Sequence, residues 1–176
     1  MALTTYTAGE VLTAASLNDN FTFAAAGSSM AIFNETQASG TNGGTFTSGS
    51  YIKRVLNTTV VNSITGCSIA SSVITLPAGT YEVFATAQGS RVERHKLRLR
   101  NTTASTDLGL GQSMFSADAN QVMNTSALQN SFVLSVSSTI ELQHQCQNTI
   151  TTNGLGIPVS FGDSEIYAQI AITKVA

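Results

Sequence analysis

The chain has 176 residues, enough for one domain with a short appendage, and 42% of them are hydrophobic. Only 10% are charged, against about 25% in an average globular protein, and the net charge is −2. This balance argues against a disordered chain, which combines low hydrophobicity with high charge, and against a protein drawn to nucleic acid by its overall charge.

Two further classes of protein are not expected. No stretch approaches the roughly 20 apolar residues of a membrane span, and the start "MALTTYTAGEV" lacks the basic and apolar parts of a signal peptide. We therefore expect no membrane insertion and no secretion by the usual route. Cys67 and Cys146 lie far apart and form no CxxC motif, which predicts two buried free thiols. The alternative is one bridge between them, which requires their strands to be neighbours.

The first 28 residues have helical rather than strand patterning. Thr13 is suited to cap a helix, Leu17 and Phe21 follow at helical spacing, and Gly27 is suited to end it. Thr7 and Glu10 have the spacing of a capping box, so an earlier start is an alternative. Such a helix is marginal alone, and we expect it to pack against copies of itself or against a docking surface.

From Met30 onward, short apolar and β-branched runs alternate with clusters of Gly, Asn, Ser and Pro. In one run Ile140, Leu142, His144 and Cys146 alternate with polar side chains, as in a strand with one buried face. Eight or more such strands predict an all-β sandwich or barrel. The expected strands lie within residues 31–37, 51–61, 72–76, 80–88, 94–101, 108–115, 128–136, 139–147 and 164–175.

The segment 91–101, "RVERHKLRLRN", contains five of the eight Lys and Arg residues of the chain. In a strand, every second side chain lies on the same face. One face then carries a basic row, and the other carries half-apolar side chains. The basic row is Arg94, Lys96, Arg98 and Arg100, and the opposite side chains are His95, Leu97 and Leu99.

Three interpretations of the basic row stay open. The favoured one is structural pairing within the sheet or across an interface between copies, with Glu82, Glu141 and Glu165 as available carboxylates. The second is contact with an anionic glycan or lipopolysaccharide. The third, nucleic acid, is disfavoured because no aromatic residue stands beside the cations in the row.

No pattern predicts catalysis or a cofactor. His95 and His144 fall in the apolar phase of their strands, which predicts buried imidazoles that are hydrogen-bonded to backbone or to each other. A metal site with Cys146 as third ligand is a minor alternative. Asp163 and Glu165 face one side of a strand and are expected to be solvated. We expect no enzyme, no metal and no cofactor.

The run Val73–Ala87, "VITLPAGTYEVFATA", resembles the strand–turn–strand of tumour-necrosis-factor-like and complement-globular-head jelly rolls. There an apolar strand ends in a Pro-Ala-Gly type turn, and a strand led by Tyr follows. The segments "ETQASGTNGGTFTSGSYIKRVLN", "RVERHKLRLRNTTASTDLGLG", "ELQHQCQNT" and "AITKVA" are similar to C-terminal domains of bacteriophage tail fibres and virion spikes, cyanophage-like ones among them. The opening "YTAGEVLTAASLNDNF" resembles the first segment of many phage fibre proteins.

The resemblance implies a jelly-roll domain over residues 29–176, a homotrimer, and a docking segment over 1–28 that attaches it to another virion protein. Localisation in the virion, after assembly in the host cytoplasm, is expected from it. The expected docking side chains are Val11, Leu12, Leu17 and Phe21. The alternative is a capsid decoration or head fibre with a purely structural role. A glycan depolymerase is disfavoured, because the chain is short for a β-helical domain.

Host contact, if it occurs, is expected at the longer polar loops, 102–107, 115–121 and 149–160. The chain has no Trp, so a glycan site would rely on hydroxyl and amide hydrogen bonds. The candidate contact residues are Thr102, Asp107, Phe115, Asp118, Asn120 and Asn153.

Overall fold

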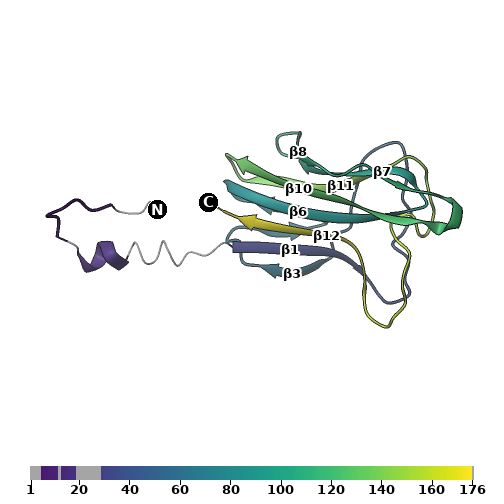
Figure 1. The fold of residues 1–176 in the computed structure, drawn as a ribbon, viewed down its shortest axis with the longest axis horizontal. Coiled ribbons are helices and arrows are strands. Elements are labelled where there is room, and N and C mark those ends of the chain that lie inside the picture. The colour runs from purple at the N-terminus through teal and green to yellow at the C-terminus, as the bar shows by residue number, and fades with distance from the viewer. Residues whose placement is uncertain (1–4, 12, 19–28, 176) are drawn as a thin grey trace.

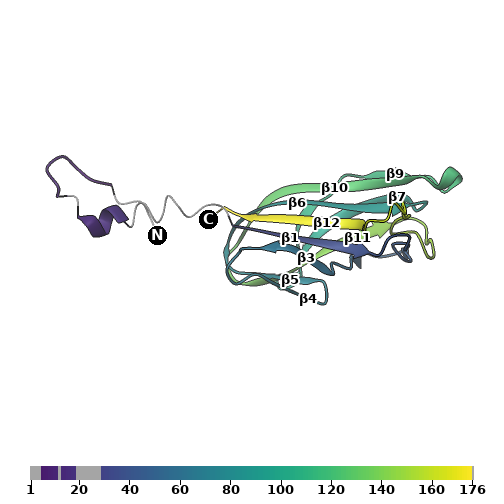
Figure 2. The ribbon, with the colours of Figure 1, turned by 90° about the horizontal axis from the view of Figure 1, so that it is seen from below.

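The computed structural model describes residues 5–11, 13–18 and 29–175. From residue 29 onward it forms two antiparallel sheets that pack face to face (Figures 1 and 2). The first sheet has the strand order β10-β6-β12-β1-β3, and the second has the order β4-β5-β11-β7-β8, with β2 added to β11 and β9 added to β7. This arrangement is a jelly-roll sandwich, which confirms the expected all-β fold.

The strands of the first sheet are β1 (Ser29–Gln37), β3 (Thr58–Asn62), β6 (Gly79–Ser90), β10 (Met123–Leu134) and β12 (Glu165–Lys174). Those of the second sheet are β2 (Ile52–Lys53), β4 (Ser68–Ala70), β5 (Val73–Leu76), β7 (Glu93–Asn101), β8 (Thr106–Leu110), β9 (Met114–Ser116) and β11 (Ser138–Cys146). One 3-10 turn, η1 (Ala119–Gln121), precedes β10. The sequence pattern does not predict β4, because three residues are too few to show alternation.

Side-chain alternation places the core between the sheets. In β11 every second residue from Ser138 to Cys146 is buried, and in β7 the buried positions are His95, Leu97, Leu99 and Asn101. Side chains of both sheets, among them Phe33 and Ile170 of the first and Leu97 and Leu142 of the second, join in one apolar cluster. A smaller cluster of Phe46, Val92, Cys146 and Leu155 lies apart from it. Burial of these side chains, at roughly 1.5–3 kcal/mol for a large one, supplies the main drive for folding.

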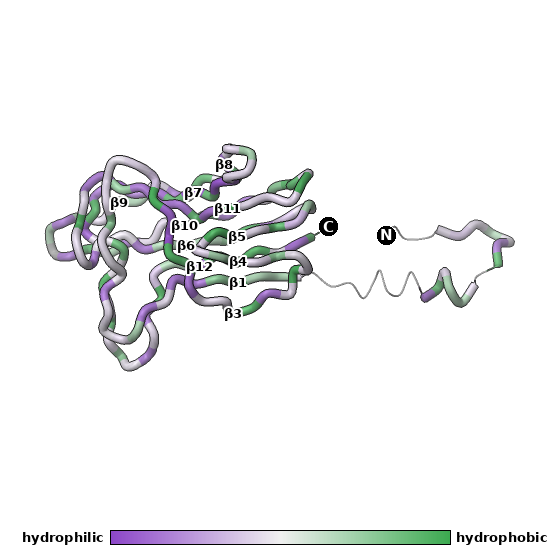
Figure 3. Tube along the Cα trace, turned by 180° about the vertical axis from the view of Figure 1, so that it is seen from behind, coloured by the Kyte–Doolittle hydropathy of each residue, from purple (hydrophilic) through white to green (hydrophobic). Residues whose placement is uncertain are grey.

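The sandwich has two different ends. Residue 29 and the end of β12 lie at one end, which we call the terminal end, together with the loops 63–67, 77–78, 102–105 and 135–137 (Figure 1). The loops 38–51, 91–92, 117–122 and 147–164 lie at the opposite end, which we call the distal end. In Figure 3 the distal loops carry mixed colours, with hydrophilic and hydrophobic residues interspersed along the chain.

Of the expected N-terminal helix, residues 14–18 are helical in the described part of the chain. Thr13 caps it as expected, because its Oγ1 accepts a hydrogen bond from the Ser16 backbone N–H at 3.2 Å. Thr7 donates its backbone N–H to Glu10 at 2.7 Å, but the chain forms a turn there and not a helix. Gly27, the expected helix end, lies outside the described residues.

Candidate functional site

The basic row lies on the outer face of the β4-β5-β11-β7-β8 sheet, as the alternation predicts. In the half of the row that lies toward the terminal end, the cations form ion pairs. Arg100 contacts Asp107 at 2.8 Å and Arg98 contacts the same carboxylate at 3.4 Å. Arg98 also donates to Gln143 at 2.7 Å, and its guanidinium lies 3.9 Å from the centre of the Tyr51 ring. Structural pairing therefore describes these two arginines.

The carboxylates expected to pair with the row are not the ones that do. Glu82 lies on the other sheet. Glu165 is buried and accepts backbone N–H groups instead of cations. Glu141 lies opposite Arg100 in register, but its carboxylate contacts Lys53 at 3.8 Å. The partner is Asp107, because the turn after β7 returns β8 along the same edge.

The distal half of the row, Arg94 and Lys96, has no ion pair with any described residue; Arg94 donates to the Gln147 amide oxygen at 3.1 Å. These two cations line an open groove of about 680 Å³. Its remaining lining is Tyr51, His95, Ser113, Met114, Phe115, Gln145, Cys146 and Gln147. The groove therefore combines free positive charge with aromatic rings and amides.

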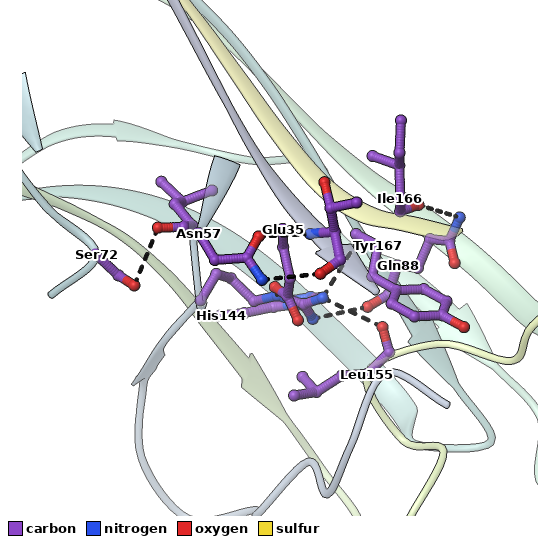
Figure 4. Close-up of polar contacts among 11 residues, drawn as sticks. Glu35, Asn57, Ser72, Gln88, His144, Leu155, Ile166 and Tyr167 are labelled. Atoms are coloured by element: carbon purple, nitrogen blue, oxygen red, sulfur yellow. Dashed lines mark hydrogen bonds and ion pairs between the residues drawn. The ribbon is translucent and has the colours of Figure 1, made fainter. Parts of the chain in front are cut away.

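A second polar cluster is buried between the sheets, toward the distal end. Arg54 is fully buried, and its Nε donates to Glu35 at 2.7 Å. Its Nη atoms donate to the backbone oxygens of Gln88, Leu155 and Tyr167 at 3.1–3.3 Å. Figure 4 shows these partners converging from the first sheet and from the 147–164 loop. All three nitrogens of the guanidinium are therefore bonded, which a buried charge requires.

The two histidines continue this cluster in one direction. Arg54 Nη1 lies 3.4 Å from His144 Nδ1, which must accept because a guanidinium only donates. His144 Nε2 then donates to His95 Nδ1 at 3.0 Å, and His95 Nε2 donates to Ser116 at 2.9 Å. Ser116 in turn donates to the Gly89 backbone oxygen at 2.7 Å. The histidines are hydrogen-bonded to each other, which is one of the two arrangements that the sequence predicts.

Burial and the charge of Arg54 lower the pKa of His95 to about 4 and the pKa of His144 well below 6.5. Both imidazoles are therefore neutral at neutral pH, which the one-directional chain of donors requires. All four ring nitrogens are engaged by protein groups, and the described residues contain no group of three His, Cys, Asp or Glu that could hold a metal ion.

Arg54 is not among the residues predicted from the sequence to form a site. The sequence does contain a signal for its burial. Ile52, Arg54 and Leu56 lie on the same face of an alternating segment, and an arginine between two apolar residues on one face is a candidate for burial. The pattern does not identify its partner. Glu35 lies on the other sheet, and no local pattern connects the two residues.

Both cysteines are free. Cys146 is buried, as predicted, and burial raises the pKa of its thiol to about 11. Cys67 is only half-buried, because it follows a turn at the terminal end where the sandwich opens to solvent.

The three candidate tip loops do not share one tip. Thr102 lies in the turn at the terminal end and bonds Thr139, and Asp107 follows it in β8. The other two loops lie at the distal end. There Phe115 is 51% exposed, Asp118 pairs with Arg91 at 2.7 Å, Asn120 lies in η1, and Asn153 lies in the 147–164 loop.

Glu165 shapes the distal end from inside. Its carboxylate accepts backbone N–H groups of Gly40, Val159 and Ser160 at 2.9–3.2 Å, which joins the 38–51 and 147–164 loops. The bond from Ser160 contributes most to lowering the pKa of Glu165. The prediction of a solvated Glu165 is therefore wrong. Glu165 is the first residue of β12, and the 147–164 loop that leads into this strand folds over its side chain. Asp163 itself is exposed.

Of the expected docking side chains, Val11 and Leu17 are exposed, and Leu12 and Phe21 lie outside the described residues. Within the described part of the chain, no helix has the length and hydrophobicity needed to cross a membrane.

The outer face of the β10-β6-β12-β1-β3 sheet is almost without charge. Among its outward-facing positions Glu82 is the single charged side chain of the described residues. Phe84 and Val133 are 49% and 70% exposed there, and Met30 is 39% exposed. In register, Ala171 of β12 lies between Ile32 of β1 and Phe84 of β6, at the centre of the face.

No family model and no curated protein matches the chain. Solved structures do match. Murine APRIL, in a crystal structure at pH 5.0, has a TM-score of 0.56 and 9% identity over 85% of this chain and 100% of its own. The globular domain of a zebrafish complement 1qA protein has a TM-score of 0.52 and 13% identity over 85% and 97%. PRD1 vertex protein P5 has a TM-score of 0.54 and 15% identity over 84% and 97%. At these identities the likeness shows the fold, which is the jelly roll of tumour-necrosis-factor-like and complement heads.

Proposed function

We propose that the chain is a structural virion protein, a fibre or spike whose trimeric jelly-roll head projects from the particle. The observation that carries the proposal is the nearly uncharged outer face of the β10-β6-β12-β1-β3 sheet. Exposed apolar side chains gathered on one face of a domain mark an interaction surface, and the cores of protein interfaces are depleted in charge. The match to a vertex protein of PRD1 supports a place on a virion.

The occupant of this face is a second and a third copy of the chain. The resemblance to tumour-necrosis-factor-like and complement heads implies a homotrimer, and a closed ring of three uses one pair of surfaces per subunit. A small side chain at the centre of the face, that of Ala171, permits close approach between copies. The opposite sheet, with its cations, remains at the outside of such a ring.

The two ends of the sandwich suggest the orientation on the particle. Residue 29 leaves the terminal end, so a docking segment in residues 1–28 would place that end toward the particle. The distal loops then face outward, where host contact occurs. We propose no catalytic role, and a screen for polysaccharide hydrolysis tests that part of the proposal.

A capsid decoration or head fibre is the second candidate function, since the same head would serve it. The position of the chain on the particle separates the two. Electron microscopy of labelled virions would locate the copies either on the tail or vertex, as a fibre or spike requires, or across the capsid lattice.

Light scattering on the purified chain is expected to give about three times the 18.4 kDa chain mass. Ala171→Arg is expected to reduce that mass to one chain, because it would place a long charged side chain at the centre of the interface, where burying the charge is costly. The monomeric variant should retain its β-sheet circular dichroism, since Ala171 faces away from the core.

Val136→Arg is the matched control. Val136 is an exposed apolar residue in the turn after β10, 59% exposed and away from the face. This variant should remain a trimer. A wild-type monomer at micromolar concentration, or a trimer that persists in Ala171→Arg, would contradict the proposal.

Deletion of residues 1–28 tests the docking segment. The truncated chain is expected to fold with an unchanged melting temperature, because the described residues 29–175 contain both sheets and the core. It should no longer join particles when it replaces the full chain during assembly. Particles that incorporate the truncated chain as well as the full one would place the docking contact elsewhere.

A further inference from the structure

We infer that the groove at the distal half of the basic row is a binding site for an acidic saccharide, a sugar that carries carboxylate or phosphate groups. The inference extends the proposed function to a class of ligand but does not require the trimer. It depends on the free charge, the shape and the lining of the groove.

Among the described residues of this sheet face, the cations without an ion pair lie in the groove. Arg98 and Arg100 share Asp107, and Lys53 has Glu141, so three cations of this sheet face are already partnered. Arg94 and Lys96 are not, and the lining of the groove contains no Asp or Glu. An anion that enters the groove therefore meets two cations without displacing a protein carboxylate.

The strand order builds the shape. In this half of the sheet β2 pairs with β11 and β9 pairs with β7, so the order across it is β2-β11-β7-β9. The outward side chains of β7 and β11 form the floor, with Lys96 opposite Gln145 in register. Tyr51, just before β2, and Phe115, on β9, stand at the two sides. The volume of about 680 Å³ falls within the roughly 300–1,000 Å³ of small-molecule sites.

The lining matches the parts of an acidic sugar. The ring of Phe115 is half-exposed and lies directly opposite Arg94 in the β-ladder, so an aromatic face and a guanidinium adjoin. Aromatic rings bury the apolar C–H face of a sugar, and a guanidinium binds a carboxylate or phosphate through paired N–H donors. Gln145 and Gln147 offer amide donors and acceptors for hydroxyl groups. Arg98 stacks on Tyr51 and so holds that ring in place.

Single-stranded nucleic acid uses the same kinds of side chain, but it needs a longer positive track. Among the described residues of this sheet face, two cations lack an ion pair, Asp107 offsets part of the charge of Arg98 and Arg100 beyond them, and the chain is acidic overall. The groove also lies on the sheet opposite the uncharged face, so trimer formation leaves it open. These observations favour a short anionic sugar over a polynucleotide.

The test is calorimetric titration of the full chain, at low salt, with four probes of known chemistry. They are an oligogalacturonate as carboxylate sugar, a phosphorylated glucan oligomer, a neutral maltooligosaccharide and an oligothymidylate. We expect at least one acidic sugar to bind, the neutral sugar to bind at least about tenfold more weakly, and binding to fall as salt screens the cations. The stronger of the two acidic probes identifies the source as a carboxylated or a phosphorylated glycan.

Variants assign the binding to the groove. Lys96→Gln and Arg94→Gln are each expected to weaken binding about tenfold, the usual size of a lost charge-assisted contact, and the double variant to abolish it. Phe115→Ser should weaken it several-fold while leaving the cations in place. Lys174→Gln, which removes the same charge from the other sheet, is the control and should bind like the wild type.

Several outcomes would overturn the inference. They are no binding of either acidic sugar, equal binding of the neutral sugar, tighter binding of the oligothymidylate, and loss of binding in Lys174→Gln. Light scattering on each variant separates this result from the proposed function, since the groove variants are expected to keep the wild-type mass. A trimer that does not bind sugar would reject the groove alone, and a monomer that binds it would reject the trimer alone.

Discussion

Replacing Arg54 with methionine is expected to lower the free energy of unfolding by about 3–5 kcal/mol, the usual cost of breaking a buried ion pair from one side. Methionine fills much of the volume of the arginine stem, so lost packing contributes little. The main cost comes from Glu35, which is 1% exposed and would remain as a buried charge without its partner. The backbone oxygens of Leu155 and Tyr167 would also lose their donor.

Acid pH provides an internal check on this explanation. Burial raises the pKa of Glu35, and Arg54 opposes that shift. Without Arg54 the opposition is gone, and the folded-state pKa of Glu35 rises further above its unfolded value. When folding raises the pKa of a carboxyl, its ionised form destabilises the fold at pH values above that folded-state pKa. This destabilisation shrinks as the pH falls from the folded-state pKa toward the unfolded-state pKa, because the carboxyl becomes protonated. The deficit of Arg54→Met relative to the wild type should therefore shrink on acidification.

Two companion variants separate charge from geometry. Arg54→Lys keeps the charge but has at most three donors for the five contacts of the guanidinium, so an intermediate loss is expected. The double variant Arg54→Met with Glu35→Leu removes both charges and should recover part of the stability lost in Arg54→Met. Urea unfolding curves measure all four chains. A loss below about 1 kcal/mol in Arg54→Met would mean that water reaches Glu35.

Gly156→Ala is expected to lower the free energy of unfolding by about 3 kcal/mol, through overpacking and backbone strain together. A Cβ atom at Gly156 would overlap the ring of Tyr167, whose hydroxyl is tied to the Thr41 backbone oxygen at 2.7 Å. The ring is buried and cannot turn away without breaking that bond. The expected consequence is displacement of the 147–164 loop, which forms much of the distal end.

Gly162→Ala is the matched control for this prediction. Both glycines have positive φ, +154° at Gly156 and +100° at Gly162, but a Cβ at Gly162 would meet no atom within 4 Å. The control should therefore show only the backbone cost, roughly 1–2 kcal/mol. Thermal unfolding of the two variants compares them directly. Equal losses would show that the Tyr167 ring yields and that the loop is not held by it.

The buried cluster bears on function through this same loop. Arg54 bonds Leu155, and Glu165 bonds Ser160, so two ionised side chains hold the 147–164 loop against the sandwich from inside. If the distal end contacts a host surface, as proposed, its shape is set by these buried residues. Loops on a rigid scaffold commonly carry contact residues for this reason.

Local alternation alone determined much of this protein. The period of two in "TIELQHQCQ" and "RHKLRLRN" predicted that His95 and His144 are buried and that the basic row faces outward, and both are confirmed. The reason is geometric, since successive side chains of a strand point to opposite faces whatever the strand packs against. The jelly roll followed from the resemblance of the "VITLPAGTYEVFATA" segment, and the fold confirms it.

The alternation pattern could not predict which side chains contact each other across strands. Alternation says that Arg98 faces outward, but the choice of Asp107 over Glu141 depends on how the turn after β7 returns the chain. Likewise, the basic row contains no aromatic residue within its own strand, β7. The structure nevertheless places an aromatic residue beside the row, because Phe115 of β9 lies opposite Arg94. Pairing across strands depends on register and strand order, which are set by the whole fold.

The same limit applies to the buried cluster and to the ends of the sandwich. Glu35 and Arg54 meet because two sheets pack face to face, and the 102–107 turn lies away from the 115–121 loop because β7 and β9 run toward opposite ends. In strands with clear alternation, such as β7 and β11, the sequence by itself determined which side chains face the core and which face solvent, since that is a property of each strand. Only the tertiary structure decided which charges meet and which loops share an end, because residues far apart in sequence become neighbours only when the sheets close over one core.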